Sequence, residues 1–187
     1  KDDELLGNPS FCKLLDRVRA YRKAADRVYE ETGHRVVYCA NITDRPERML
    51  ENARRAEELG AGMVMVNQVS AGLGMVQAVA EDPEVSIPLI THYAGAGVLT
   101  ESPVSGISSP LLLGKFSRLA GADGSSCSSL YSSYPVLRAN YLRIADFLRM
   151  PLHDIKPAVP IVGGGVTPST AVSIVRDLGC DVMLGVG

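Results

Sequence analysis

The segment Val159-Pro160-Ile161-Val162-Gly163-Gly164-Gly165 decides the fold class, because an apolar run stops abruptly here at three glycines. The run has the length and composition of a buried strand. A helical pattern follows from Pro168 to Leu178, and Gly179 is placed to end it. A second apolar run covers residues 181–186. Strand, helix and strand in this order predict two parallel strands joined by a crossover helix.

The same alternation of apolar runs and amphipathic segments extends through the rest of the chain. Strands are predicted at residues 36–41, 62–67 and 87–92, with a weaker candidate at residues 121–123 where small residues dilute the signal. Helices are predicted at residues 11–32, 43–60, 110–119 and 139–148. Thr43 or Asp44 is expected to cap the second of these helices, and Gly60 to end it.

Mostly apolar strands that alternate with helices predict an α/β fold with a parallel sheet, either doubly wound or a (β/α)8 TIM barrel. The near-regular repeat favours the barrel, as do the polar or glycine residues at each strand end. If residues 1–4 close another strand, about seven of the eight strand positions are present. We therefore expect residues 1–187 to be one incomplete barrel domain, truncated at both ends.

Composition excludes several classes of function. The net charge of −2 argues against binding to nucleic acid. No apolar run reaches the roughly 18 residues that a membrane span needs, so no membrane partner is expected. The four cysteines lie far apart in the sequence, without a CxxC pair, which is typical of reduced thiols in a cytoplasmic protein.

Glycines follow two successive strands near the end of the chain. Gly163, Gly164 and Gly165 precede the helix that begins near Pro168, and Gly185 and Gly187 occupy the next strand exit. Backbone N–H groups in such loops can point at an anion, and the loops after the last two strands of a TIM barrel commonly bind phosphate. The pattern predicts a phosphorylated substrate, with a flexible turn as the alternative.

The chain begins with Lys1-Asp2-Asp3-Glu4, a lysine followed by three acids. Carboxylate oxygens at the carboxyl end of a strand suit a hard cation such as Mg²⁺. A solvated surface turn is the alternative interpretation, because charged neighbours usually face water.

Taken together, these segments resemble the large subunit of ribulose-bisphosphate carboxylase and its RuBisCO-like relatives. The resemblance covers the whole chain in order. It implies that the amino-terminal domain of that family is absent from this sequence. The residues that carry it are Lys1–Glu4, Tyr38–Thr43, Asn67, Thr91-His92, Leu111–Lys115, Gly121–Asp123 and the two glycine exits.

The resemblance implies a metal site with an unusual ligand. In the family, the lysine reacts with CO₂ to form a carbamate, which would make Lys1, Asp3 and Glu4 the ligands of Mg²⁺, with Asp2 pointing away. Carbamylation turns a cationic amine into an anionic oxygen donor. The resemblance also assigns His92, at a predicted strand end, to contact with the substrate.

Asn41 and Asn67 lie at two further predicted strand ends. They are candidates for orienting the metal ligands or the substrate hydroxyl groups. Ordinary hydrogen bonding at a strand end is the alternative.

Three departures from the carboxylases point to another branch of the family. The loop after the predicted sixth barrel strand, residues 125–134, lacks the lysine that carboxylases use to stabilise CO₂. Tyr93 stands where the family has an arginine, and Gly163 where it has a serine. Tyrosine cannot replace a bidentate phosphate clamp, so the second phosphate of a bisphosphate is not expected to bind.

The sequence therefore predicts an enzyme that enolises a monophosphorylated keto or diketo compound with Mg²⁺. The RuBisCO-like branch with this equipment contains the 2,3-diketo-5-methylthiopentyl-1-phosphate enolases of methionine salvage. Alternatives are an isomerase or decarboxylase of a phosphorylated sugar or sugar acid, a true carboxylase, and a barrel kept for binding a partner. A homodimer is expected by resemblance.

Overall fold

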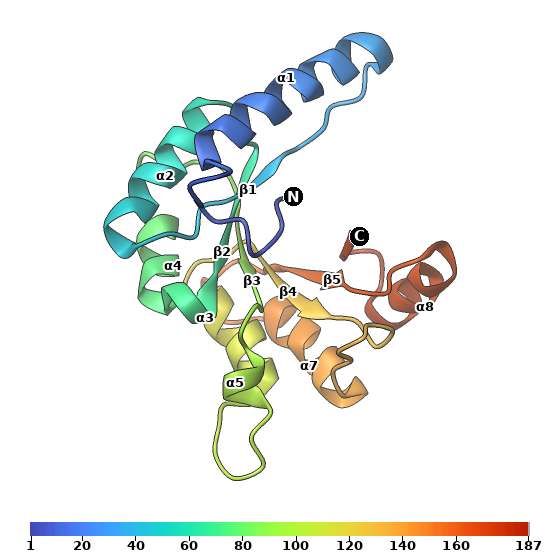
Figure 1. Cartoon of the computed structure of the whole chain (residues 1–187). Helices are drawn as coiled ribbons and strands as arrows, with labels where there is room; N and C mark the ends of the chain where they lie inside the picture. Colours follow the sequence, from blue (N-terminus) through green and yellow to red (C-terminus); the bar gives the residue numbers. More distant parts are fainter. Residues whose placement is uncertain (187) are drawn as a thin grey trace.

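The computed structural model describes residues 1–186, in which six parallel strands form one curled sheet with helices on its outer side (Figure 1). The strands lie in the sheet in chain order. This arrangement is part of a (β/α)8 barrel, so the predicted fold class is confirmed. The strands are β1 Cys39–Asn41, β2 Met63–Asn67, β3 Leu89–His92, β4 Gly124–Ser128, β5 Val159–Gly163 and β6 Met183–Gly185.

One helix precedes β1 and the others connect successive strands, and the long helices lie close to their predicted positions. None of them, within residues 1–186, has the length and apolar character that crossing a membrane requires. Their bounds are α1 Leu14–Thr32, α2 Pro46–Glu58, α3 Gln68–Ala71, α4 Leu73–Ala80, α5 Gly97–Thr100, the π-helix η1 Pro110–Phe116, α6 Ser117–Leu119, α7 Arg138–Arg149 and α8 Pro168–Leu178.

The predicted cap of α2 is wrong. Arg45 occupies the N-cap position and makes no side-chain capping bond. The Asp44 carboxylate is engaged elsewhere, because it accepts hydrogen bonds from the side chains of Asn8 and Asn52 and from the backbone N–H of Arg45. The Thr43 hydroxyl accepts a bond from the backbone N–H of Asn67 at 2.9 Å. The side chains of Thr43 and Asp44 therefore bind residues of other segments and do not cap α2.

Two predicted strands differ from the structure. The weak candidate at residues 121–123 is the approach to β4, which runs from Gly124 to Ser128 and is buried throughout. The sequence did not predict this strand because it is rich in serine, whereas buried strands are normally recognised by their β-branched residues. Residues 1–4 form no strand; they lie beside β1, where the backbone N–H of Asp2 donates to Cys39 at 2.9 Å.

Successive side chains of a strand point to opposite faces of the sheet, and both faces of this sheet are buried. On β2, Val64 and Val66 join the helices of the outer layer, while Met63 and Met65 face the interior of the barrel. The interior group is small and apolar. Its other members are Cys39, Ile90 and Ile161. The carboxyl ends of the strands stand above this interior and are therefore positioned to form a site.

Candidate active site

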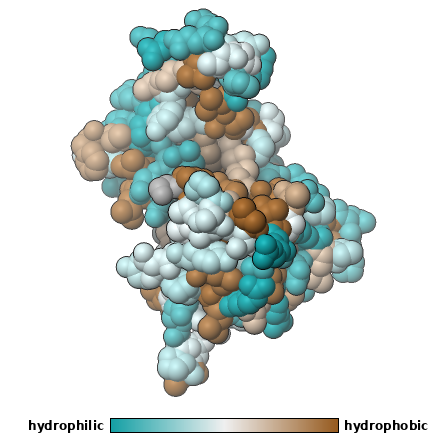
Figure 2. All heavy atoms as spheres, turned by 90° about the vertical axis from the view of Figure 1, so that its right-hand side faces the viewer, coloured by the Kyte–Doolittle hydropathy of each residue, from teal (hydrophilic) through white to brown (hydrophobic). Residues whose placement is uncertain are grey.

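A cavity of about 720 Å³ lies on the concave side of the sheet and is lined by the barrel interior and by residues at the carboxyl ends of the strands. Figure 2 looks at the molecule from the side on which the two termini lie, and apolar atoms gather across the middle of that face. The floor is made by the apolar interior of the barrel. The polar and glycine residues that line the cavity are Lys1, Asp2, Asp3, Glu4, His92, Tyr93, Ser126, Gly163, Gly164 and Gly185.

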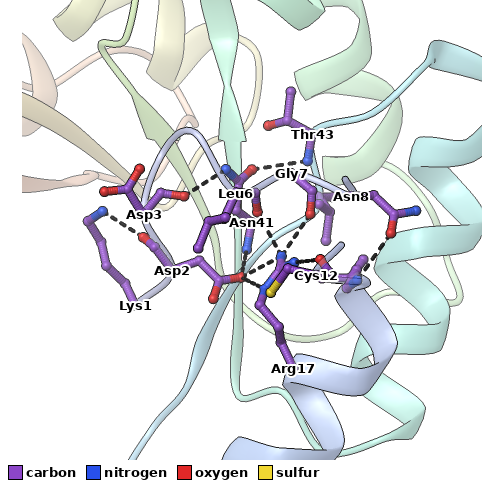
Figure 3. A network of polar contacts seen from close by, with 12 residues as sticks. Lys1, Asp2, Asp3, Leu6, Gly7, Asn8, Cys12, Arg17, Asn41 and Thr43 are labelled. Carbon is purple, nitrogen blue, oxygen red and sulfur yellow. Dashed lines mark hydrogen bonds and ion pairs between the residues drawn. The ribbon is translucent and has the colours of Figure 1, made fainter. Parts of the chain in front are cut away.

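The side chains of Lys1 and Asp3 point to one side of the chain and that of Asp2 to the other (Figure 3). Lys1 and Glu4 lie together, with 3.7 Å between Nζ and Oε2, and each side chain is about one-third exposed. The Asp3 carboxylate accepts a hydrogen bond from the backbone N–H of Leu5 at 2.8 Å. Asp2 turns away from them and is buried. The sequence expectation that Asp2 differs from its three neighbours agrees with this geometry.

Asn41 and Asn67 hold the backbone that carries the acids. The Asn41 side-chain amide donates to the carbonyl oxygens of Asp3, at 3.2 Å, and Glu4, at 3.0 Å. The amide of Asn67 donates to the same Glu4 carbonyl at 2.7 Å. Neither asparagine is among the residues that line the cavity. Both asparagine side chains bind peptide carbonyls of this segment, and their role in orienting the acids stays a prediction.

His92 ends β3 with its imidazole directed at the acids. Its Nε2 lies 3.7 Å from Glu4 Oε2, and its Nδ1 accepts a hydrogen bond from the backbone N–H of Ala94 at 3.1 Å. Burial lowers the pKa of His92 to about 4, although the nearby Glu4 carboxylate opposes that shift. The ring is therefore neutral at pH 7. With Nδ1 occupied as an acceptor, the proton is on Nε2, which faces the cavity.

Tyr93 stacks on the His92 ring, with 4.7 Å between the ring centroids. It is partly buried and lines the cavity beside Ser126, whose hydroxyl oxygen accepts the Tyr93 backbone N–H at 3.3 Å. Burial raises the pKa of the Tyr93 phenol, so the side chain carries no charge at neutral pH. This part of the cavity therefore offers a neutral ring.

The glycines after β5 and β6 take different positions. Gly163, Gly164 and Gly185 line the cavity, whereas Gly165 does not. Gly165 has a φ of +64° and lies against the backbone of Tyr131 in the loop after β4. Gly187, the other predicted anion ligand, lies outside the described residues. An anion cradle in this structure would therefore be built from Gly163 and Gly164 on one strand exit and Gly185 on the next.

The side chains of Lys1, Asp3 and Glu4 are the predicted ligands of Mg²⁺. Among residues 1–186, no group of three or more His, Cys, Asp and Glu side chains is arranged to hold a metal. Asp3 and Glu4 offer two carboxylates, and the Lys1 amine lies beside Glu4. A carbamate on Lys1 would add the missing anionic oxygen, which makes the set one of hard donors. The residues therefore fit a magnesium site that depends on modification of Lys1.

Comparison with known proteins identifies the family. The model of the catalytic domain of the ribulose bisphosphate carboxylase large chain matches residues 1–187. The chain belongs to this family. A ribulose bisphosphate carboxylase-like protein of Archaeoglobus fulgidus is 41% identical over 188 residues, which cover 100% of this chain and 43% of that protein.

Two further RuBisCO-family relatives share the whole length of the chain. The 2,3-diketo-5-methylthiopentyl-1-phosphate enolase of Bacillus cytotoxicus is 37% identical over 187 residues, covering 100% of this chain and 45% of that enzyme. The crystal structure of a RuBisCO-like protein from Alicyclobacillus acidocaldarius superposes with a TM-score of 0.93 at 37% identity, covering 100% of this chain and 47% of that one. The chain thus spans less than half the length of these relatives.

Sequence reasoning missed two residues that hold the side chain of Asp2. Arg17 and Tyr38 both bind the buried Asp2 carboxylate. A signal for Arg17 was present, because it occupies the i+3 position after Leu14 in the apolar stripe of α1, where a charged residue needs a partner. Tyr38 gave no such signal, since a tyrosine before a strand is ordinary.

Proposed function

We propose that the full-length protein enolises a phosphorylated diketone with Mg²⁺, with 2,3-diketo-5-methylthiopentyl 1-phosphate as the substrate. One observation carries this proposal. Lys1, Asp3 and Glu4, the neutral His92, and the glycines at the β5 and β6 exits line a single cavity. The enolase name of a relative that is 37% identical supports the same substrate.

The acidic loop, residues 1–4, supplies the electrostatic part of the reaction. Asp3, Glu4 and the carbamate of Lys1 would hold the metal, and the asparagines fix the peptide that carries the two acids. Mg²⁺ when bound would supply a Lewis acid that stabilises negative charge on a substrate oxygen. A preorganised site of this kind lowers the barrier to enolisation, because its dipoles need not reorganise as charge develops.

His92 and the glycines would position the substrate. The Nε2–H of the neutral imidazole can donate to an oxygen on which charge develops, and the stack on Tyr93 and the bond from Ala94 fix the ring. Backbone N–H groups around Gly163 and Gly164, which line the cavity, would bind one phosphate. Tyr93 carries no positive charge with which to bind a second phosphate. The end of the substrate that lies far from its phosphate should therefore be uncharged.

The serine-rich loop after β4 does not favour the alternative of a sugar isomerase. Ser128 and Ser129 donate to the carbonyls of Tyr134 and Gly164, and Ser132 accepts from the backbone N–H of Tyr134. These hydroxyls are engaged in shaping the loop and its contact with the glycine exit. Ser126 is the serine of this segment that lines the cavity.

A direct assay of the full-length protein tests the proposal. Enol formation from the diketone is followed with and without Mg²⁺ and after preincubation with bicarbonate. Activity is expected only with both, and a panel of phosphorylated sugars and sugar acids should give none. Ribulose bisphosphate with labelled bicarbonate should yield no carboxylated product. Turnover of a sugar phosphate with the diketone inert, or labelled product above background, would overturn the assignment.

We also propose a cytoplasmic homodimer. The support for the location is that Cys12, Cys39, Cys127 and Cys180 are free thiols. The dimer rests on the family resemblance. Sedimentation equilibrium of the full-length protein tests it, and a monomer at micromolar concentration would contradict it.

A further inference from the structure

The guanidinium group of Arg17 is the centre of a buried polar network behind the acidic loop (Figure 3). Its Nε and Nη2 both donate to Asp2 Oδ2, at 3.2 and 2.9 Å. Nη1 donates to the Cys12 carbonyl at 2.6 Å, and Nη2 also reaches the carbonyls of Leu6 and Gly7, each at 2.7 Å. All three nitrogens are therefore engaged with the segment that leads from Lys1 into α1.

The Asp2 carboxylate is held from three directions. Besides Arg17, it accepts a hydrogen bond from the Tyr38 hydroxyl at 2.6 Å and one from the backbone N–H of Asn41 at 2.9 Å. The side chains of the ion pair are 7% and 2% exposed, so water contributes little to their solvation. A buried carboxylate with this many donors is fixed in both position and direction.

The side chain of Asp2 points to this network, away from those of Lys1 and Asp3 (Figure 3). Asp2 sits between these two residues in the chain, and Glu4 follows them in a turn. Fixing Asp2 therefore fixes the direction of both neighbours. The carbonyls bound by Arg17 also close the loop after Glu4, which limits its movement away from β1.

We infer that Arg17 is a positioning residue, which sets the geometry of Lys1, Asp3 and Glu4 through Asp2 and the loop carbonyls. This inference rests on the proposed function, because it takes these three residues as the magnesium ligands. Arginine suits the task, because its planar guanidinium group carries several N–H donors and can bind several acceptors at once. Lysine would keep the positive charge but would lose this planar set of donors.

Arg118 provides a matched control for loss of stability. It is 1% exposed and donates to the backbone carbonyls of Met150, Ile155 and Lys156. It is thus also a buried arginine that holds a loop. That loop precedes β5 at the amino end of the strand, and Arg118 does not line the cavity. Its replacement should cost stability without moving the metal ligands.

The experiment compares Arg17→Lys, Tyr38→Phe and Arg118→Lys in the full-length protein. Mg²⁺ affinity is measured by calorimetry in the presence of bicarbonate, and the lysine carbamate by its ¹³C signal. Arg17→Lys should weaken Mg²⁺ binding at least tenfold and reduce the carbamate signal. Tyr38→Phe removes a single donor to Asp2 and should weaken binding about two- to fivefold. Arg118→Lys should lower the unfolding temperature and leave Mg²⁺ affinity within twofold of wild type.

The outcomes separate the inference from the proposed function. Mg²⁺ affinity within twofold of wild type in Arg17→Lys would overturn the positioning role. If that variant does not fold, Tyr38→Phe decides in the same way, because loss of one hydroxyl leaves the ring and its stack on Tyr21 in place. Mg²⁺ binding by the wild type without enolisation would overturn the function alone. A wild type that binds no Mg²⁺ would overturn both.

Discussion

The backbone carbonyl of Tyr131 lies against the Cα of Gly165, in the space that any side chain at that position would occupy. Tyr131 belongs to the loop after β4 and Gly165 to the exit from β5, so this contact joins two neighbouring loops of the cavity rim. The adjoining bond from the Ser129 hydroxyl to the Gly164 carbonyl joins them a second time. The loop after β4 and the exit from β5 are therefore held together by two contacts.

Substitution of Gly165 should therefore disturb the loop after β4. Gly165→Ala would place a methyl group on the Tyr131 carbonyl and force a positive φ on alanine, at a cost of about 1–3 kcal/mol. The unfolding temperature of the full-length protein should fall, and proteolysis near Tyr131 should become faster. Thermal unfolding and limited proteolysis measure the two effects.

Gly163→Ala is the matched control and the cleaner test of phosphate binding. A Cβ at Gly163 would meet its nearest neighbour, the Gly185 carbonyl oxygen, at 3.9 Å, which is an ordinary contact. Stability should stay near that of wild type, while a methyl group on the cavity wall should weaken binding of a phosphorylated ligand. Equal losses of stability in the two variants would contradict this account.

Lys1→Ala should abolish magnesium-dependent turnover, because the donor set then lacks its third anionic oxygen. In wild type, preincubation with bicarbonate should raise the rate, and removal of Mg²⁺ by a chelator should abolish it. Lys156→Ala is the control, since that lysine is 72% exposed and pairs with Asp123 away from the cavity. A Lys1→Ala enzyme as active as wild type would remove Lys1 from the mechanism.

His92→Ala should lower kcat/KM by about 10²-fold or more, the usual cost of losing one donor to a developing oxyanion. His34 is exposed and outside the cavity, so His34→Ala should leave the rate unchanged. Steady-state kinetics on the diketone measure both variants. A change below about threefold in His92→Ala, under roughly 0.7 kcal/mol, would mean that the ring is only packed there.

Asp44 should make stability depend on pH in the acid range. Burial alone would raise the pKa of Asp44, but hydrogen bonds from Asn8, Arg45 and Asn52 outweigh it and lower the pKa. A carboxyl with a lowered pKa stabilises the fold above its unfolded pKa, and this contribution is lost as the pH falls through the folded value. The wild type should therefore lose stability as the pH falls through the pKa that Asp44 has in the folded protein.

The Asp44→Asn variant tests this contribution. It should unfold a few degrees below wild type at pH 7, corresponding to about 1 kcal/mol, and the difference should shrink as the pH is lowered through the acid range. Unfolding temperatures measured across pH provide the check. A difference that stays constant with pH would show that Asp44 contributes by packing alone.

The sequence predicted the fold class because the strands of the outer region are apolar and separated by regular helices. It failed at β4, where Ser125 and Ser126 face buried surroundings that only the neighbouring strands supply. Strand pairing is a long-range property, and local composition carries little information about it. The cap of α2 failed for a related reason, since Asp44 binds residues distant in the sequence.

The candidate site was predictable where residues at successive strand ends share one edge of the sheet. That rule placed His92 and Gly163 at the cavity, and the family resemblance placed Lys1 and Glu4 there. It could not show that Asn41 binds peptide carbonyls. Nor could it show that Gly165 serves the contact with Tyr131, because these are details of packing between loops.

The curled sheet has a consequence for substrate choice. The acidic loop stands at β1 and the glycine exits at β5 and β6, so the whole sheet lies between them. Neighbouring strands keep a spacing of about 4.8 Å, and only the curvature of the sheet can change the gap between the two ends of the cavity. Met65 and Ile161 pack together on the concave side of the sheet, and Ile161 also lines the cavity. The volume of these interior side chains should therefore influence the length of the substrate that the cavity accepts.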